Sequence, residues 1–276
     1  MLCATSDTAR LLEEADIIHL TRQVEVCSQF FSGQEIRAQP VGHGIAGVTV
    51  TAFGRKLNHV VGFGMGGPVS EDDLAAVERL FAEKRLPIEI DLCPHTDATA
   101  LEVLALRGYT VNGWINSYVR ILTESDLQEV DIPGIQIYRV TPERSDEFPS
   151  ISVAGYRDGG RLELLLETLA RCAVLRPDTH LYFASIDGKI AGSAGLALIE
   201  TSGGRVAHLY IDSTLPEYRG RGIQAALLKA RLSDARKAGY DVASVAARPT
   251  SVSSRNIERA GFSLAYTKAT FVRSLT

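Results

Sequence analysis

The stretch TLPEYRGRGIQAALL, residues 214–228, decides the fold class and the chemistry of this 276-residue chain. It joins a strand-like segment, 206–212, to a helical segment, 222–238, through a loop with two glycines and two arginines. Glycines let the backbone turn so that several N–H groups point toward one position, and the first N–H groups of a helix lack intrahelical partners. Together with the charges of Arg219 and Arg221, this loop predicts a seat for a diphosphate.

The elements around the loop predict alternating strands and helices. Strands are expected at 134–140, 180–186, 189–199, 206–212, 241–247, 263–266 and 270–275, and helices at 162–173, 222–238 and from about Ser253. Asp187-Gly188 predicts a two-residue hairpin turn. This order indicates an α/β (α+β) fold, with a sheet that carries helices on both faces.

The first half of the chain resembles the second. LRGYTVNGWINSYVRIL at 106–122 aligns with RAGFSLAYTKATFVRSL at 259–275. A strand, helix and strand pattern precedes each copy, in the first half at 59–63, 71–84 and 88–92. A duplication therefore predicts two domains, residues 1–125 and 135–276, joined by an acidic linker at 126–134 that ends in Pro133-Gly134.

The composition is that of an ordinary globular protein, with 45% hydrophobic residues, 22% charged residues and a net charge of −4. Such a chain is not expected to bind nucleic acid or anionic membranes. No apolar run approaches the ~18 residues of a membrane span. Residues 1–7 lack a basic region followed by an apolar stretch, so a secretory signal is not expected. The four cysteines lie far apart and form no metal-binding motif, so we expect a cytoplasmic protein without a metal site. Residues 126–276 hold nineteen basic side chains against ten in 1–125, which favours an anionic ligand in the second half.

Three features of the second half resemble the GNAT superfamily of N-acetyltransferases. The pattern Arg219-x-x-Gly222-x-Gln224, after Pro216 and before a long helix, resembles its acyl-coenzyme A loop, although the family usually has Gly or Ala at the position of Gln224. Ala260-Gly261-Phe262 resembles its late Gly-Phe signature, and the order of elements from 134 to 275 is similar to its fold. The resemblance implies a GNAT-like mixed sheet flanked by helices, in two tandem copies of which the first is degenerate and binds no cofactor.

The resemblance also implies roles for individual residues. The backbone at the end of the central strand would bind the pantetheine arm of acetyl-coenzyme A, and the loop would bind its pyrophosphate. Polar residues of the short helix would touch the cofactor, although Ser253 is also suited to cap that helix. The implied cofactor-binding residues are Asp212, Ser213, Thr214, Arg219, Gly220, Arg221, Gly222, Ile223, Gln224, Ala225, Ser253 and Asn256.

The catalytic positions depart from the family pattern. Ile257 stands where many members have a tyrosine that protonates the leaving thiolate, so Tyr266 or solvent is expected to serve as the acid. His208 lies six residues before Thr214, where several members have a glutamate base, and a histidine can deprotonate an amine. The alternative interpretation is a partly buried structural histidine. Strand alternation predicts that His208, Tyr210, Asp212 and Thr214 share one face.

A second glycine-rich stretch, from Gly62 to Gly67, satisfies G-x-G-x-x-G and would suit a dinucleotide. However, the next helix is predicted to begin at Ser70 with a capping box to Asp73, and its acidic side chains would repel phosphate. The stretch 42–47 also matches, but a strand-like segment at 48–53 follows it.

The leading hypothesis is an acyl-coenzyme A-dependent acyltransferase that moves an acetyl group to an amine by direct attack in a ternary complex. A small-molecule acceptor is favoured, and small amines, aminoglycosides, amino acids and protein N-termini all stay open. A non-catalytic module that binds or senses coenzyme A is the alternative, and Ile257 favours it. A nicotinamide-dependent oxidoreductase that uses 62–67 is the third hypothesis. Thiol release from acetyl-coenzyme A with a panel of amines separates the first two.

Overall fold

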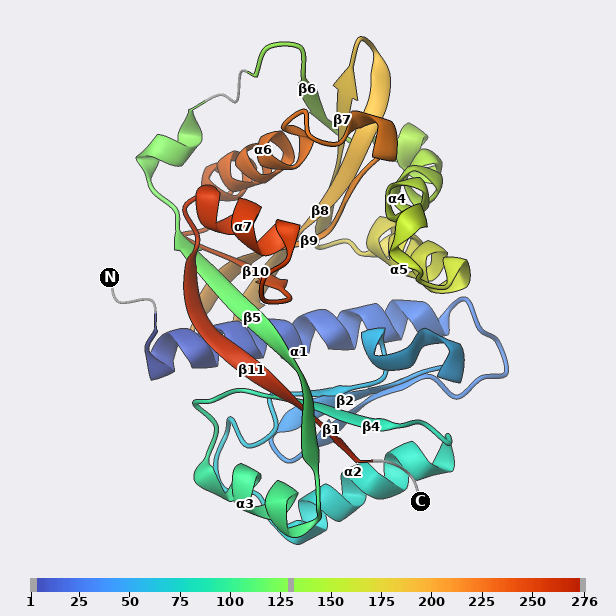
Figure 1. The fold of residues 1–276 in the computed structure, drawn as a ribbon, viewed down its shortest axis with the longest axis vertical. Helices are drawn as coiled ribbons and strands as arrows, with labels where there is room; N and C mark the ends of the chain where they lie inside the picture. Colours follow the sequence, from blue (N-terminus) through green and yellow to red (C-terminus); the bar gives the residue numbers. More distant parts are fainter. Residues whose placement is uncertain (1–3, 129–131, 274–276) are drawn as a thin grey trace.

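One eleven-stranded mixed sheet organises the chain, as a computed structural model of residues 4–128 and 132–273 shows (Figure 1). The strand order is β1-β2-β3-β4-β11-β5-β10-β9-β8-β7-β6. The neighbouring strands are antiparallel, except that β3 is parallel to β4 and β9 is parallel to β10.

The two halves of the chain contain similar series of elements. In the first half these are α1 (Ser6–Ser28), β1 (Arg37–Val41), β2 (Gly44–Val48), the 3-10 helix η1 (Thr51–Lys56), β3 (Val60–Val61), α2 (Glu71–Glu83), β4 (Ile88–Leu92), α3 (Ala98–Leu106) and β5 (Thr110–Ile121). In the second half they are β6 (Gln136–Arg139), α4 (Phe148–Tyr156), η4 (Arg157–Gly159), α5 (Glu163–Leu175), β7 (Thr179–Ile186), β8 (Lys189–Thr201), β9 (Gly204–Thr214), η5 (Pro216–Tyr218), α6 (Ile223–Lys237), β10 (Val242–Ala247), α7 (Val252–Arg259) and β11 (Ser263–Arg273).

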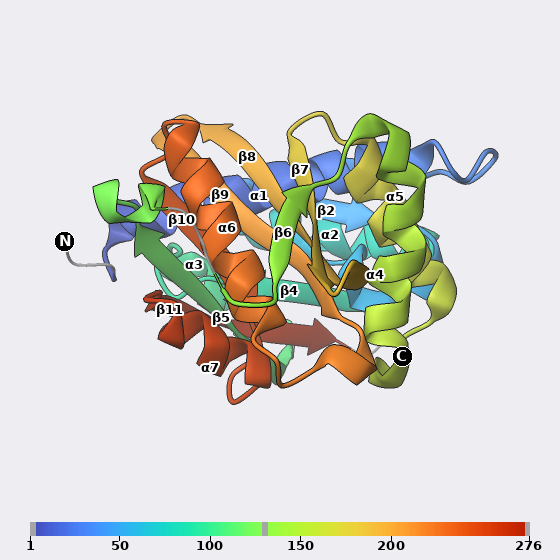
Figure 2. The ribbon, with the colours of Figure 1, turned by 90° about the horizontal axis from the view of Figure 1, so that it is seen from above.

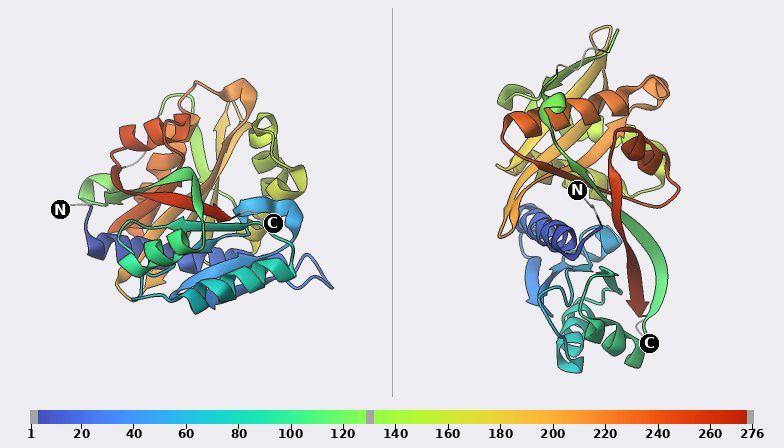
Figure 3. Two further views of the ribbon diagram at one scale, coloured as in Figure 1. Left: turned by 60° about the horizontal axis from the view of Figure 1, so that its bottom comes forward. Right: turned by 90° about the vertical axis from the view of Figure 1, so that its left-hand side faces the viewer.

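The halves exchange strands at the centre of the sheet. β5, from the first half, pairs with β10 of the second half, and β11, from the second half, pairs with β4 of the first. β5 and β11 also pair with each other along most of their length, and they run together from one half to the other (Figure 3). Each half of the sheet is therefore completed by a strand from the other half.

The structure also shows the internal repeat. Gly108 follows α3 with φ +72°, and Gly261 follows α7 with φ +84°, so both glycines adopt a left-handed conformation immediately before the exchanged strands. The predicted fold class, a mixed sheet flanked by helices in a tandem arrangement, is confirmed. The domain boundaries at 125 and 135 stay predictions, and residues 129–131 of the expected linker lie outside the described residues, as do 1–3 and 274–276.

The helices cover the second half of the sheet on opposite faces. α6 lies on one face and α4 and α5 lie on the other (Figure 2). α1 packs on the same face as α4 and α5, where its residues contact β8, β9, β11 and α5. Lys268 of β11, which is 2% exposed, bonds there to Glu13 and Asp16 of α1 at 2.7 Å each. Buried charge pairs thus join α1 to β11, the strand that the second half contributes beside β4.

Three of the predicted strands differ from the structure. The strands expected at 263–266 and 270–275 form the single strand β11, and the strand expected at 48–53 is wrong because β2 ends at Val48 and η1 follows. The predicted hairpin around Asp187-Gly188 and the strand at 88–92 are confirmed. Within residues 4–128 and 132–273, no helix is long and apolar enough to cross a membrane.

Candidate functional site

A bulge in β9 shapes the centre of the second half. Ile211 has φ +53°, which is a strained conformation for a β-branched residue, and the pairing of β9 with β8 shifts register between Ser193 and Gly195. Because the bulge interrupts strand alternation, the prediction that His208 and Asp212 share one face is wrong. His208 packs against His19 of α1, whereas Asp212 pairs with Arg231 of α6 on the opposite face.

Beyond His208 the two parallel strands separate. β9 and β10 pair from Val206 and Val242 to His208 and Ser244, and no pairing between them continues farther in the described chain, although β9 runs on to Thr214. After this point the β10-side edge of β9 has no strand partner in the described chain and can bind an extended ligand, although the Asp212 carbonyl accepts a hydrogen bond from Tyr156.

The loop after β9 presents the beginning of α6. Gly220 and Gly222 have φ +74° and +84°, and no side chain caps the helix at Gly222. A Cβ at Gly220 would meet no atom within 4 Å, and one at Gly222 would meet only Ile135 at 3.9 Å. The unpaired N–H groups of the first helical turn therefore face open space, as an anion site requires.

The two arginines of the loop behave differently. Arg219 donates to the Asp158 carboxylate at 2.5 Å and to the Gly155 carbonyl at 3.0 Å, so it ties the loop to α4 and η4. Arg221 is exposed, with its guanidinium carbon 5.5 Å from the centre of the Tyr218 ring. Arg221 is therefore the arginine that is free to approach a phosphate.

Three predicted polar residues meet beside the first turn of α6. The Gln224 side chain accepts from Asn256 Nδ2 at 2.7 Å and lies 3.4 Å from Ser253 Oγ. Ser251, rather than Ser253, caps α7 by accepting from the Ser254 N–H. The cap interpretation of Ser253 is therefore wrong, which leaves its hydroxyl beside the loop. Ala225 is exposed on this turn, and Ile223 is buried under it.

A buried ion pair, which the sequence analysis did not identify, holds the bulge. Arg231 is fully buried and donates to both carboxylate oxygens of Asp212, at 2.5 and 2.8 Å. It also donates to the Gly195 carbonyl at 3.0 Å, opposite the register shift. Arg231 lies one helical turn after Leu227 on the buried face of α6, so its sequence position resembles that of a core residue.

Tyr156 at the end of α4 is a second residue that the sequence analysis missed. Its hydroxyl donates to the Asp212 carbonyl at 2.5 Å, immediately after the bulge. Burial, and then the charge of Asp212, raises the pKa of Tyr156, so the phenol keeps its proton at neutral pH. This places a proton donor beside the point where the strands separate.

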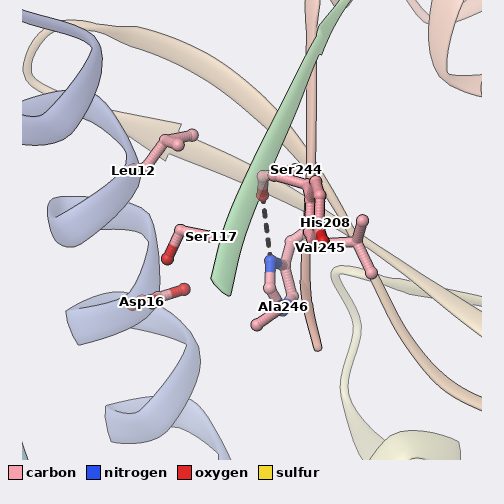
Figure 4. A pocket seen from close by; sticks show the side chains of 8 residues that line it. Leu12, Asp16, Ser117, His208, Ser244, Val245 and Ala246 are labelled. Atoms are coloured by element: carbon pink, nitrogen blue, oxygen red, sulfur yellow. Dashed lines mark hydrogen bonds between the residues drawn. The ribbon is translucent and has the colours of Figure 1, made fainter. Parts of the chain in front are cut away.

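His208 lies at the inner end of this opening, on the face that packs against α1. Its Nδ1 shares a 3.0 Å hydrogen bond with Ser244 Oγ (Figure 4). Its ring centre is 4.6 Å from that of His19. The side chain is 7% exposed, and burial lowers its pKa below the usual value of 6.5. His208 is therefore neutral at pH 7, the form in which a base acts, and its catalytic role stays a prediction.

Tyr266 lies in the buried polar cluster between β11 and α1. Its hydroxyl donates to Glu13 Oε1 at 2.7 Å, and burial raises its pKa well above the usual value of 10. In residues 4–128 and 132–273 it makes no hydrogen bond to a predicted cofactor-binding residue. Its role as the acid also stays a prediction.

The glycine-rich stretch from Gly62 to Gly67 precedes a helix whose beginning is already capped. Ser70 and Asp73 form the predicted capping box, with hydrogen bonds of 2.8 and 3.2 Å between side chain and backbone. Glu71, Asp72 and Asp73 fill the first turn of α2. Acidic side chains thus stand where a diphosphate would need cations.

Comparisons with known proteins agree with this geometry. Residues 138–262 match the Acetyltransferase (GNAT) family, and no curated protein matches the chain. A GCN5-related N-acetyltransferase from Kribbella flavida superposes with a TM-score of 0.65 at 16% identity, covering 94% of this chain and 96% of that one. A tandem GNAT protein from the clavulanic acid biosynthesis pathway gives 0.61 at 14% identity, with 91% and 87% covered. These likenesses show the fold, and they extend over both halves.

Proposed function

We propose that this chain, whose residues 138–262 match the Acetyltransferase (GNAT) family, transfers an acetyl group from acetyl-coenzyme A to a small-molecule amine. One observation carries the proposal. The uncapped beginning of α6 lies beside the strands β9 and β10 where they separate, so a diphosphate and an extended arm can bind together.

The cofactor would bind along this opening. The backbone of Asp212, Ser213 and Thr214 would bond the pantetheine arm, and the N–H groups from Gly220 to Ala225, with Arg221, would hold the pyrophosphate. Gln224, Ser253 and Asn256 form a polar edge at the same turn. Arg219 acts through the loop, because its guanidinium is bound to α4 and η4.

The reaction needs two proton transfers. The amine nitrogen attacks the thioester carbonyl, a C–N bond forms and the C–S bond breaks, with a backbone N–H near the bulge stabilising the oxyanion. Neutral His208, directly or through water, would take the proton that the amine loses. Tyr156 would protonate the thiolate, because its hydroxyl lies at the bulge and stays protonated. Tyr266, the acid expected from the sequence, or solvent is the alternative donor.

Gly222→Glu should reduce the affinity for acetyl-coenzyme A by at least about tenfold, or about 1.4 kcal/mol. The new carboxylate would stand at the beginning of α6, where the pyrophosphate is expected. Calorimetric titration measures the change. Gly188→Glu is the matched control, because Gly188 also has positive φ, +73°, but lies at the turn between β7 and β8. If both variants bind acetyl-coenzyme A with equal affinity, the pyrophosphate does not bind at the beginning of α6.

Tyr156→Phe should lower kcat by about tenfold, the loss expected for one hydrogen-bonding proton donor in the transition state. Acetyl-coenzyme A affinity should change little, since the ring remains. Single-turnover kinetics together with calorimetry separate the two quantities. If the variant binds the cofactor more weakly but keeps its kcat, Tyr156 positions the bulge and does not donate the proton.

Thiol release from acetyl-coenzyme A with a panel of amines tests the proposal as a whole. Amine-dependent release supports the transferase. Tight binding of acetyl-coenzyme A without release from any amine supports the non-catalytic alternative, for which the absence of a tyrosine at Ile257 is the motivating observation.

A further inference from the structure

Three exposed cations lack an ion-pair partner in the described residues. They are Lys56 of η1, Arg161 between η4 and α5, and Arg248 directly after β10, and all three side chains are exposed. Within the described part of the chain, none of them forms an ion pair or a side-chain hydrogen bond. The neighbouring Arg55, in contrast, is neutralised by Glu89 and Asp91.

Lys56 lies near the beginning of α5, because the next residue, Leu57, belongs to the same core cluster as Leu165 of α5. Desolvation by the surrounding protein, followed by the charges of Arg161, Arg55 and Arg248, lowers the pKa of Lys56 to about 8, against the opposite effect of Asp91. Lys56 is thus exposed to solvent while protein surrounds it on several sides. Holding like charges together in such a place costs free energy, and an anion between them would offset this cost.

The cluster of Lys56, Arg161 and Arg248 is connected to the proposed site. The Arg161 guanidinium carbon lies 5.5 Å from the centre of the Tyr156 ring, and Tyr156 bonds to the bulge of β9. Arg248 follows Ala247, the last residue of β10, and strand alternation places it on the same face as Ser244 and Ala246.

The sheet is open on that face. Ala246 is exposed although β10 lies in the middle of the sheet. A small cavity continues inward from Ala246 to the predicted base (Figure 4). The side chains that line it come from α1, β5, β9 and β10: Leu12, Asp16, Ser117, Tyr118, His208, Ser244, Val245 and Ala246. The cavity therefore contains the predicted base, His208, and a carboxylate, Asp16.

We propose that Lys56, Arg161 and Arg248 bind an anionic group of the acceptor, a carboxylate or a phosphate, so that the substrate is an amine that also carries a negative charge. The inference rests on the proposed function for the identity of the bound molecule. Since Lys56 belongs to the first half of the chain, that half contributes directly to the acceptor site.

Binding tests the anion site independently of catalysis. Inorganic phosphate and acetate are titrated calorimetrically, at constant ionic strength and with saturating coenzyme A, into the wild type and the variant Lys56→Gln/Arg248→Gln. The double variant should bind the anion at least about tenfold more weakly. Lys189→Gln is the control, because Lys189 is an exposed lysine at the β7–β8 hairpin. Equal affinities in the wild type and the double variant would overturn the proposal.

Paired acceptors then distinguish carboxylate from phosphate. Glycine is compared with glycinamide, other amino acids with their amides, and phosphoethanolamine with ethanolamine. With the wild type, the preferred pair should show a lower KM for the anionic member. The double variant should raise that KM to the value of the neutral member, while the kcat and the KM for the neutral member stay unchanged. Equal use of both members of every accepted pair would contradict the inference. Anion binding without thiol release from any amine would instead contradict the proposed function.

Discussion

Arg231→Met should lower the free energy of unfolding by about 3–5 kcal/mol, because it leaves the Asp212 carboxylate without its partner beside the bulge. Arg231 is fully buried, and its guanidinium is bound to Asp212 and to the Gly195 carbonyl. Urea unfolding followed by circular dichroism measures the loss. Acetyl-coenzyme A binding should weaken as well, because the bulge loses its support.

Two further variants separate the pair from simple packing. The double variant Arg231→Met/Asp212→Leu should regain much of the lost stability, since it removes both charges together. Arg236→Gln is the control, because Arg236 pairs with Glu124 and Asp241, whose side chains are 78% and 70% exposed, and it should unfold like the wild type. A single Arg231 variant as stable as the wild type would show that the ion pair does not hold the bulge.

His208→Ala should reduce kcat by about 10²- to 10⁴-fold at pH 7, the range over which a positioned base accelerates proton transfer. The affinity for acetyl-coenzyme A should stay nearly the same. The loss should become smaller as the pH rises, because more of the amine is then free without a base. Steady-state kinetics from pH 6 to 9 measure both effects.

The pH dependence of the wild type gives a second readout. Burial lowers the pKa of His208, and a base acts in its neutral form, so the acidic limb of kcat should lie below pH 6.5. His180→Ala is the control for removing a histidine, because His180 is half-buried on β7. A His208 variant with wild-type kcat at pH 7 would make His208 a structural residue that holds Ser244 and α1.

The parts of the site that depend on local sequence could be predicted. The loop from Arg219 to Gln224 combines glycines, arginines and a helix, and each of these signals acts over a few residues. The expected contact of Ser253 and Asn256 with the cofactor came from the order of elements in the GNAT superfamily. The capping box at Ser70 was likewise a local pattern, and the structure confirms it.

The parts that depend on distant contacts could not be predicted. The bulge at Ile211 gives a β-branched residue φ +53°, which the sequence disfavours and which the ion pair of Arg231 and Asp212 supports from α6. α1 carries buried polar residues such as Glu13, whose partner Lys268 lies 255 positions away in the sequence numbering. The apolar pattern of α1 was therefore too weak to indicate a core helix.

The exchange of β5 and β11 has a consequence for how the protein is made. Synthesis proceeds from the amino terminus, so β4 and β5 are complete long before residues 263–273 exist to lie between them. Until then β4 lacks one neighbouring strand and β5 lacks both, and such open strand edges are sites for incorrect pairing with other chains. Its sheet closes only when β11 inserts, so the first half cannot mature as an independent unit. The strand that is synthesised last thus completes the centre of the sheet, and each half of the sheet needs a strand from the other half before its pairing is complete.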